Sequence, residues 1–243
     1  MKRMLIVGAL TLAAAGQALA ADLPQPGAPP PPRAPAMYVP TMAPVYNWGG
    51  VYVGVNGGYG FGSSNWTSAA AASTGSFNTN GFLLGGTIGA NFQANQFVFG
   101  VEADLDWTTL KGSTSTPTTA GFCTGVSCQT ANNWLGTVRG RLGYAFDRVL
   151  VFGTGGGAFG NIQAGRNPPT TYDTATNFGW TAGGGVEFAF SENLTGKIEY
   201  LFVDLSNGTC TTIANCGAAA AGSSVSFTAN VVRAGINYKF GGF

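Results

Sequence analysis

The sequence contains no histidine, and only 9% of its 243 residues are charged. Without histidine, the Ser-His and Cys-His pairs that usually activate a nucleophile cannot be assembled. We therefore expect a protein that is not an enzyme. The charged fraction lies far below the quarter that is typical of soluble domains. This deficit favours a protein whose outer surface does not face water.

Long apolar runs are also lacking. After the first twenty residues no run of about 18 apolar residues occurs, so a membrane-spanning helix is not expected. Removal of Lys2 and Arg3 with the N-terminal segment would leave nine basic against ten acidic side chains. This balance gives no electrostatic basis for binding nucleic acid.

The first twenty residues have the pattern of a secretory signal peptide. Lys2 and Arg3 form a basic start, residues 4–15 are apolar, and Ala18-Leu19-Ala20 is a small-x-small cleavage site. A proline-rich linker follows over residues 21–47, and we expect it to be extended rather than packed. Residues 48–243 form the third region, which is rich in glycine, aromatic and β-branched residues.

The four cysteines form two local pairs, Cys123 with Cys128 and Cys210 with Cys216. Four cysteines allow three pairings, and proximity favours these two. A zinc site is the competing interpretation. It is disfavoured because the chain has no histidine and is expected in an oxidising compartment.

Eight segments of strand-like composition follow residue 47. The connections between them alternate strictly: residues 61–80, 108–132, 162–177 and 206–225 are long, whereas residues 93–95, 147–148 and 191–193 are short. This pattern predicts an all-β fold, an eight-stranded antiparallel up-and-down transmembrane β-barrel. The predicted strands are Trp48–Gly60, Gly81–Phe92, Gln96–Trp107, Asn133–Phe146, Val149–Asn161, Phe178–Phe190, Leu194–Leu205 and Ser226–Phe240.

Alternation with a period of two assigns the faces of the strands. In residues 133–146 the even positions are apolar, while Arg139 and Arg141 lie on the opposite face. Residues 97–107, 178–190, 194–205 and 226–240 divide in the same way, but residues 149–161 carry no charge that would orient them. A soluble sandwich would also alternate, but it would usually carry many more surface charges.

The charged face must point into the lumen, which in an eight-stranded barrel is filled by side chains. Glu102 and Asp104 are the expected partners of Arg139 and Arg141, because their strands are neighbours. The network could neutralise itself and plug the lumen, could line a weakly selective path for small solutes, or could supply acid and base groups. The structural role is favoured. The predicted lumen network is Glu102, Asp104, Asp106, Arg139, Arg141, Glu187, Lys197, Glu199 and Arg233, with Lys239 near the periplasmic rim.

No cofactor or metal site is expected. The glycine-rich stretch Gly153–Gly160 superficially resembles a dinucleotide fingerprint, but it lacks a following helix and an acidic residue about 20 positions later. We interpret it as a strand.

The third region resembles the small outer-membrane β-barrel proteins of α-proteobacteria, the Omp25/Omp31-like group. The resemblance covers residues 48–240 and is carried by WGGVYVGVNGGYGFG, VRGRLGYAFDRVLVFGTGGGAFG, GWTAGGGVEFAFSENLTGKIEYLFVDL and VVRAGINYKF. It implies an abundant, surface-exposed and antigenic envelope protein, with porin-like activity in some members and no shared catalytic site. Some relatives with a mature Ala-Asp start look peptidoglycan-linked, which implies attachment here through Ala21. The alternative is an untethered leader.

Both termini are expected in the periplasm, and the insertion signal read by the barrel assembly machinery is either Phe240 or Phe243. We expect a monomeric structural protein of the outer membrane that supports envelope integrity and contacts membrane lipid, lipopolysaccharide, the assembly machinery and peptidoglycan. A porin-like channel is the alternative, and a surface adhesin that acts through its long loops is the third hypothesis.

Overall fold

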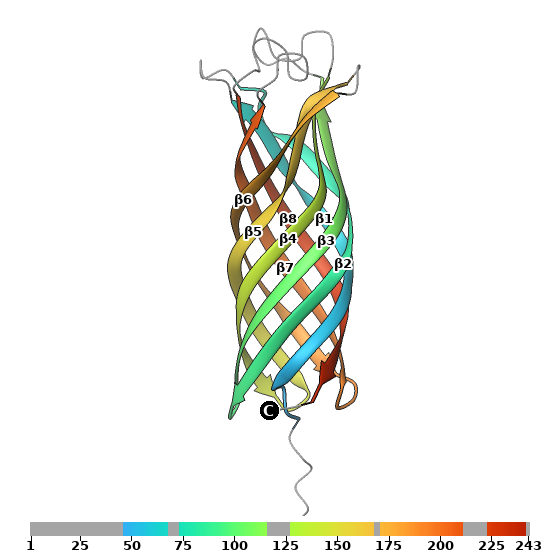
Figure 1. The fold of residues 1–243 in the computed structure, drawn as a ribbon, viewed down its shortest axis with the longest axis vertical. Helices are drawn as coiled ribbons and strands as arrows, with labels where there is room; N and C mark the ends of the chain where they lie inside the picture. Colours follow the sequence, from blue (N-terminus) through green and yellow to red (C-terminus); the bar gives the residue numbers. More distant parts are fainter. Residues whose placement is uncertain (1–45, 68–72, 116–126, 168–170, 211–222, 242–243) are drawn as a thin grey trace, which may run out of the picture. The chain divides into compact units, whose positions relative to one another are not determined.

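A computed structural model describes residues 46–67, 73–115, 127–167, 171–210 and 223–241. These residues form eight β-strands that close into one barrel in sequence order, which confirms the predicted fold class (Figure 1). Among them no helix has the length and hydrophobicity to cross a membrane. The strands are β1 (Gly50–Thr67), β2 (Phe77–Ala94), β3 (Phe97–Thr114), β4 (Ser127–Phe146), β5 (Val149–Asn167), β6 (Thr171–Ala189), β7 (Leu194–Cys210) and β8 (Ser223–Phe240).

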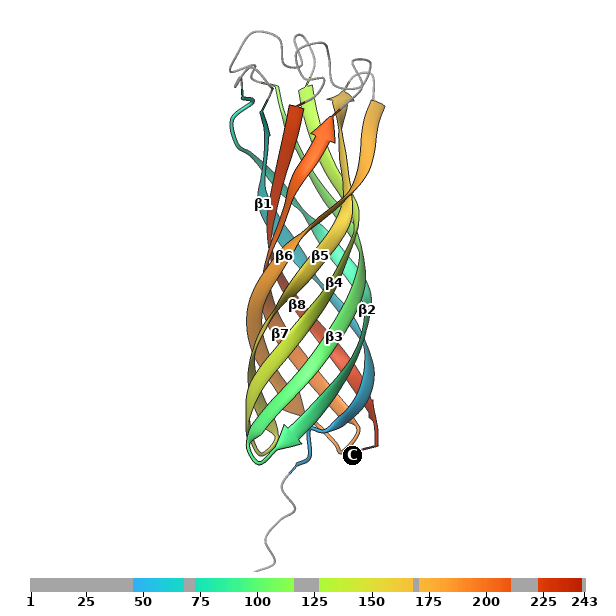
Figure 2. The ribbon, with the colours of Figure 1, turned by 60° about the vertical axis from the view of Figure 1, so that its left-hand side comes forward.

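The barrel closes because β1 pairs antiparallel with β8 as well as with β2. Neighbouring strands of the described barrel are all antiparallel, and they tilt steeply around its axis (Figures 1 and 2). Through the middle of the barrel, closure leaves no unpaired sheet edge, which is the condition for β-structure in a lipid environment.

The short connections join the strands at one end of the barrel, which we call the short-turn rim. Asn95 between β2 and β3 and Asp147 between β4 and β5 have left-handed backbone angles, with φ of 55° and 53°. Asparagine and aspartate tolerate this conformation better than most residues. These residues therefore fix two of the tight turns at the positions that the sequence predicts.

The strands are longer than predicted at the opposite end, the long-connection rim. β1 continues to Thr67, β4 begins at Ser127 and β8 begins at Ser223. Much of the predicted long connections is therefore strand, and the predicted boundaries there are wrong. The cause is a change in which face of the strand is apolar, while the same positions continue to face inward. In β8, Arg233 faces inward and Val232 outward, but beyond them Val225 and Phe227 face inward while the serines between face outward.

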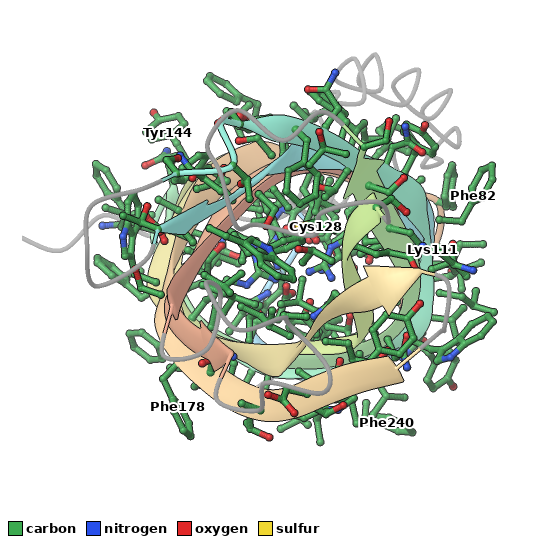
Figure 3. The ribbon with its side chains drawn as sticks, turned by 90° about the horizontal axis from the view of Figure 1, so that it is seen from above. Phe82, Lys111, Cys128, Tyr144, Phe178 and Phe240 are labelled. Carbon is green, nitrogen blue, oxygen red and sulfur yellow. The ribbon has the colours of Figure 1, made fainter. Side chains whose placement is uncertain are left out.

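The outer face of the barrel is apolar around its middle. Phe82 and Phe178 are 69% and 73% exposed, and both point away from the wall in the view along the axis (Figure 3). On β3 the roughly ten steps from Phe97 to Trp107, at about 3.3 Å each and about 40° of tilt, span about 25 Å. This height matches the apolar band of an outer-membrane barrel.

The structure also orients β5, whose faces the sequence left unassigned. Leu150, Phe152 and Ala158 are buried and face the lumen, whereas Val151 is 46% exposed on the outer face. The even positions of β5 therefore point inward in its first half.

Residues 46–48 pack against the short-turn rim. Tyr46 and Trp48 are only 7% and 2% exposed, and β1 begins at Gly50 rather than at Trp48. The expectation that the linker stays unpacked up to residue 47 is therefore wrong at its end. The signal peptide and the rest of the linker lie outside the described residues.

Candidate functional site

The lumen is filled by three layers of buried side chains. A charged layer occupies its middle, an apolar layer lies at the short-turn rim, and a larger apolar layer lies at the long-connection rim. All nine of the predicted lumen residues lie in the charged layer and are at most 5% exposed: Glu102, Asp104, Asp106, Arg139, Arg141, Glu187, Lys197, Glu199 and Arg233.

Arg139 lies at the centre of the charged layer. It lies directly opposite Glu102 in the β3–β4 register, and its Nη2 donates to Glu102 Oε1 at 2.5 Å and to Asp104 Oδ2 at 2.9 Å. Nη1 donates to Glu199 Oε2 at 3.0 Å, and Nε to Thr137 Oγ1 at 2.9 Å. One guanidinium thus joins carboxylates from β3 and β7, and the structure brings Arg139 together with both acids expected for it.

Two further cations complete this cluster. Arg233 Nε donates to Glu199 Oε1 at 2.9 Å and its Nη1 to Asp106 Oδ2 at 2.7 Å, and Nη1 also pairs with Asp104. Lys197 Nζ lies 2.8 Å from Glu102 Oε1 and 3.1 Å from Glu199 Oε1. The carboxylates therefore meet two or more cations each where the cluster is densest, which offsets the cost of burying charge.

Arg141 pairs with one of the two acids expected for it, Glu102, and with a third acid that was not expected. Its register partners are Gly100 in β3 and Thr154 in β5, and its Nη1 is 4.0 Å from Glu102 Oε2. Its closest carboxylate is Glu187 of β6, with which Nη2 pairs past the intervening strand β5. The prediction did not include Glu187 because it considered only adjacent strands. In so narrow a barrel, side chains from strands that are not adjacent meet.

Neutral groups hold the second ion pair in place. Thr195 Oγ1 and Asn237 Nδ2 donate to Glu187 Oε1 at 2.5 Å and 2.9 Å. The Arg141 guanidinium lies 3.9 Å above the Phe152 ring. Thr195 and Asn237 were not predicted, although their inward parity and polar side chains would have identified them. Phe152 lies on β5, which carries no charge that would orient it in the sequence.

Tyr52 links the two ion clusters. Its hydroxyl donates to Glu102 Oε2 at 2.7 Å and accepts from Arg141 Nη1 at 3.3 Å. A Cβ at Gly89 would lie 2.4 Å from the Tyr52 hydroxyl oxygen and ring. Glycine at this position therefore leaves the space in which the Tyr52 ring crosses the lumen.

The apolar layer at the short-turn rim is closed by Trp48. This ring is buried with Tyr46, Val98, Leu150 and Phe152. Trp48 and Tyr46 rings pack edge to face, with centroids 4.8 Å apart. Their packing covers the charged layer from below.

Residues 46–48 also bond to each short turn of the described barrel. Trp48 N donates to Gln93 Oε1 at 2.6 Å beside the β2–β3 turn, and Trp48 Nε1 donates to the Asp147 carbonyl at 2.9 Å. The Tyr46 hydroxyl donates to the Glu192 carbonyl at 3.2 Å, and burial raises the pKa of Tyr46 to about 12, so the phenol stays protonated. We call residues 46–48 with these contacts the latch.

The layer at the long-connection rim is mainly apolar, with buried polar side chains such as Ser64, Thr130 and Asn132 at the same end of the lumen. Trp66 lies within it, and its Nε1 donates to Thr130 Oγ1 at 2.9 Å. The layer closes the lumen above Asp106 and Arg233. Its members are Trp66, Phe77, Leu83, Leu110, Cys128, Leu135, Ala158, Ile162, Ala164, Leu201, Val203, Leu205, Val225, Phe227, Ala229 and Val231.

Several predicted residues are placed only in part. Phe240 ends β8 with its ring 54% exposed on the outer face, and Phe243 lies outside the described residues. Lys239 lies at the short-turn rim, where its Nζ is 4.3 Å from the centre of the Tyr46 ring. Cys128 is buried at the start of β4. Ala21, Cys123 and Cys216 lie outside the described residues, as does the side chain of Cys210, so both pairings stay predictions.

The arrangement closes the lumen. The acids of the charged layer are engaged by arginine and lysine, and both ends of this layer are covered by apolar side chains. Within the described residues, no three side chains of the metal-ligating types gather as a candidate metal site.

Comparison with known proteins shows the family of this chain. Residues 34–240 match the model of the outer membrane protein beta-barrel domain. The 31 kDa outer-membrane immunogenic protein of Brucella melitensis is 37% identical over 221 residues, which cover 83% of this chain and 88% of that protein. The 25 kDa outer-membrane immunogenic protein of Brucella canis is 30% identical over 244 residues, with 99% of each chain covered. Among solved structures, OprG of Pseudomonas aeruginosa aligns with 81% of this chain and 98% of its own at 12% identity and a TM-score of 0.42.

The fold and the family match define an outer-membrane β-barrel protein. The chain belongs to the outer membrane protein beta-barrel family and is of the Omp25/Omp31 type, as the resemblance of its motifs implied.

Proposed function

We propose that this protein is a structural component of the outer membrane that supports envelope integrity, with both termini in the periplasm, and that it has no catalytic role. The observation that carries the proposal is the closed lumen. A filled barrel presents no described route for solutes, so its contribution to the cell lies in its rigidity and its attachments.

The latch supports attachment through the N-terminus. A chain that leaves the barrel at Tyr46 is bonded to the turns of three hairpins, so a pull on it is shared among them. The proposed anchor is Ala21. The roughly 25 residues between Ala21 and the latch, at about 3 Å each in polyproline form, reach about 75 Å.

The tether is tested by mass spectrometry of digested cell walls. The expected result is a peptidoglycan fragment that carries the peptide beginning Ala21-Asp22. In a strain lacking the native gene, wild-type chain should restore normal release of outer-membrane vesicles. A chain that lacks residues 23–42 should insert equally well but restore it poorly. Equal restoration by the two chains, with no wall-bound peptide, would refute the tether.

A surface-interaction role is the second candidate. The strands extend past the apolar band with polar outward side chains such as Asn78, Asn80 and Thr228, which suits a part that stands in water. The relatives that are named immunogenic support exposure of this end. Shaving the long connections from intact cells should abolish ligand or cell binding without changing barrel folding if this role exists.

A further inference from the structure

Two neighbouring strands of the barrel separate beyond the apolar band. The β6–β7 ladder ends at the pair of Trp180 and Asp204, close to Phe178, which is exposed on the outer face. By contrast, β6 stays paired with β5 as far as Thr171, and β7 with β8 to the end of β7. The ends of β6 and β7 stand apart in both side views (Figures 1 and 2). Residues 171–177 of β6 therefore pair on one side only among the described strands, and we call them the open edge.

The backbone groups of every second residue in the open edge point away from β5. In an antiparallel ladder, successive residues direct their N–H and C=O groups alternately to the two neighbouring strands. The Asp204 carbonyl oxygen points to β6, since a side chain at Gly179 would meet it, so the paired Trp180 directs its own groups to β7. The β5–β6 ladder continues from there without a register shift. Thr174 and Thr176 have the parity of Trp180, so their N–H and C=O groups lie on the open side.

The open edge lacks the features that usually keep a sheet edge from pairing. Natural edges are often protected by lysine, proline or a bulge. Residues 171–177 contain no lysine and no proline, carry one charged side chain, Asp173, and pair with β5 without a bulge. Three of these residues are threonines, which favour strands. An edge of this composition is suited to pairing with a further strand.

Geometry selects an extended segment of another protein as the occupant. A row of alternating backbone donors and acceptors is matched by the backbone of another strand. A second copy of the chain is poorly placed to supply it. Two copies that stand in one membrane are related by an axis along its normal, and strands tilted by about 40° would then cross at about 80° instead of lying side by side.

The side chains around the open edge specify the character of this segment. Thr174 and Thr176 are exposed on the outer face, whereas Ile162 and Leu205 are buried in the apolar layer on the lumen side. Side chains of a strand alternate between the two faces of a sheet. An added strand would therefore place one set of side chains beside the threonines and the other set against the apolar layer.

We propose that the open edge binds an extended segment of a partner protein at the cell surface by strand addition. The segment alternates small polar with apolar residues and carries little charge, and its backbone bonds to the N–H and C=O groups of Thr174 and Thr176. The proposal deepens the surface-interaction role given under the proposed function and rests on the outward orientation of the long-connection rim.

Amide hydrogen exchange followed by NMR tests the proposal on the full mature chain refolded in detergent micelles. The probe is a soluble peptide of alternating threonine and valine with a lysine at each end. Without the peptide, the amides of Thr174 and Thr176 should exchange rapidly, while the amide of Ala175, which faces β5, stays protected. Near-saturating peptide should slow exchange at both threonines by about tenfold or more.

Two variants at one position separate the backbone from the side chain. Thr176→Pro removes an N–H on the open side, which an edge strand tolerates. It should weaken peptide binding about three- to tenfold, as expected for one backbone hydrogen bond. Thr176→Val keeps this N–H and is the matched control that should bind as wild type. Gel migration before and after boiling verifies that each variant has folded.

Four results would overturn the proposal. Protection of Thr174 and Thr176 without peptide at every chain concentration would show that the chain covers its own edge, and protection that appears only as this concentration rises would show a second copy there. No added protection by the peptide, or equal binding by wild type and Thr176→Pro, would show that the edge takes no strand. Closure of the lumen, vesicle release and the effect of shaving the long connections are measured separately, so failure here would leave the proposed function standing.

Discussion

Arg141 of β4 pairs with Glu187 of β6 past the intervening strand β5 on the lumen side of the wall. Removal of either partner leaves a buried charge without its counter-ion. In a double-mutant cycle of Arg141→Met and Glu187→Gln, we expect the two losses to be non-additive by about 1–3 kcal/mol. Urea unfolding in lipid vesicles measures all four chains. Strict additivity would contradict the pairing.

Arg139 should matter more than any other lumen cation, since it joins Glu102, Asp104 and Glu199. We expect Arg139→Met to lower the free energy of unfolding by about 3–5 kcal/mol, because three carboxylates lose a shared donor. Arg148→Met is the control. Arg148 is exposed in a short turn, and its replacement should change stability little. Equal losses in both variants would show that the network contributes nothing specific.

Trp48 should be the main contributor of the latch to stability. Trp48→Ala removes a ring that is 2% exposed and the hydrogen bond from Nε1 to the Asp147 carbonyl, so we expect a loss of about 3–5 kcal/mol. Trp180→Ala, which removes a ring 53% exposed on the outer face, should cost less. The unfolding midpoint followed by tryptophan fluorescence gives the comparison. A larger cost at Trp180 would contradict the assignment of Trp48 as a buried plug.

The edge of the apolar band on β8 lies where the outward residues change from apolar to polar. Ile236→Arg places a charge in the middle of this band and should cost about 2–4 kcal/mol. Ser226→Arg lies on the same outward face of the same strand but beyond the band, and it should cost almost nothing. Refolding yields and unfolding curves in vesicles distinguish these positions. Similar costs at both would place the bilayer edge elsewhere.

The membrane-spanning half of the fold could be predicted from the sequence because its chemistry is strict. A lipid environment requires apolar residues on the outer face, and a narrow lumen requires paired charges. Arg139 and Glu102 therefore indicate which positions of their strands face inward and which residues form an ion pair. Beyond the apolar band the outer face is polar and the inner face is apolar. Phe227 and Val225 turn inward while Ser226 turns outward, so the apolar-outward pattern that marks the membrane-spanning part of the strand no longer holds there.

The contacts that the sequence could not supply depend on closure. Arg139 of β4 meets Glu199 of β7, and Arg233 of β8 meets Asp106 of β3, because a ring of eight strands brings distant residues to one axis. The latch was missed for a different reason. Tyr46 and Trp48 follow a proline-rich stretch, and nothing in their own pattern indicates the three turns that they bond.

The closed lumen is the central claim, and conductance of the refolded mature chain in a planar bilayer tests it most directly. We expect no current steps above the baseline for wild type, because two apolar layers cover a paired charged layer. We also expect none for Trp48→Ala, in which the charged layer and the other apolar layer remain. Reproducible steps in the wild-type chain, altered by Arg139→Ala or Glu102→Ala, would contradict this claim and establish a path through the charged layer.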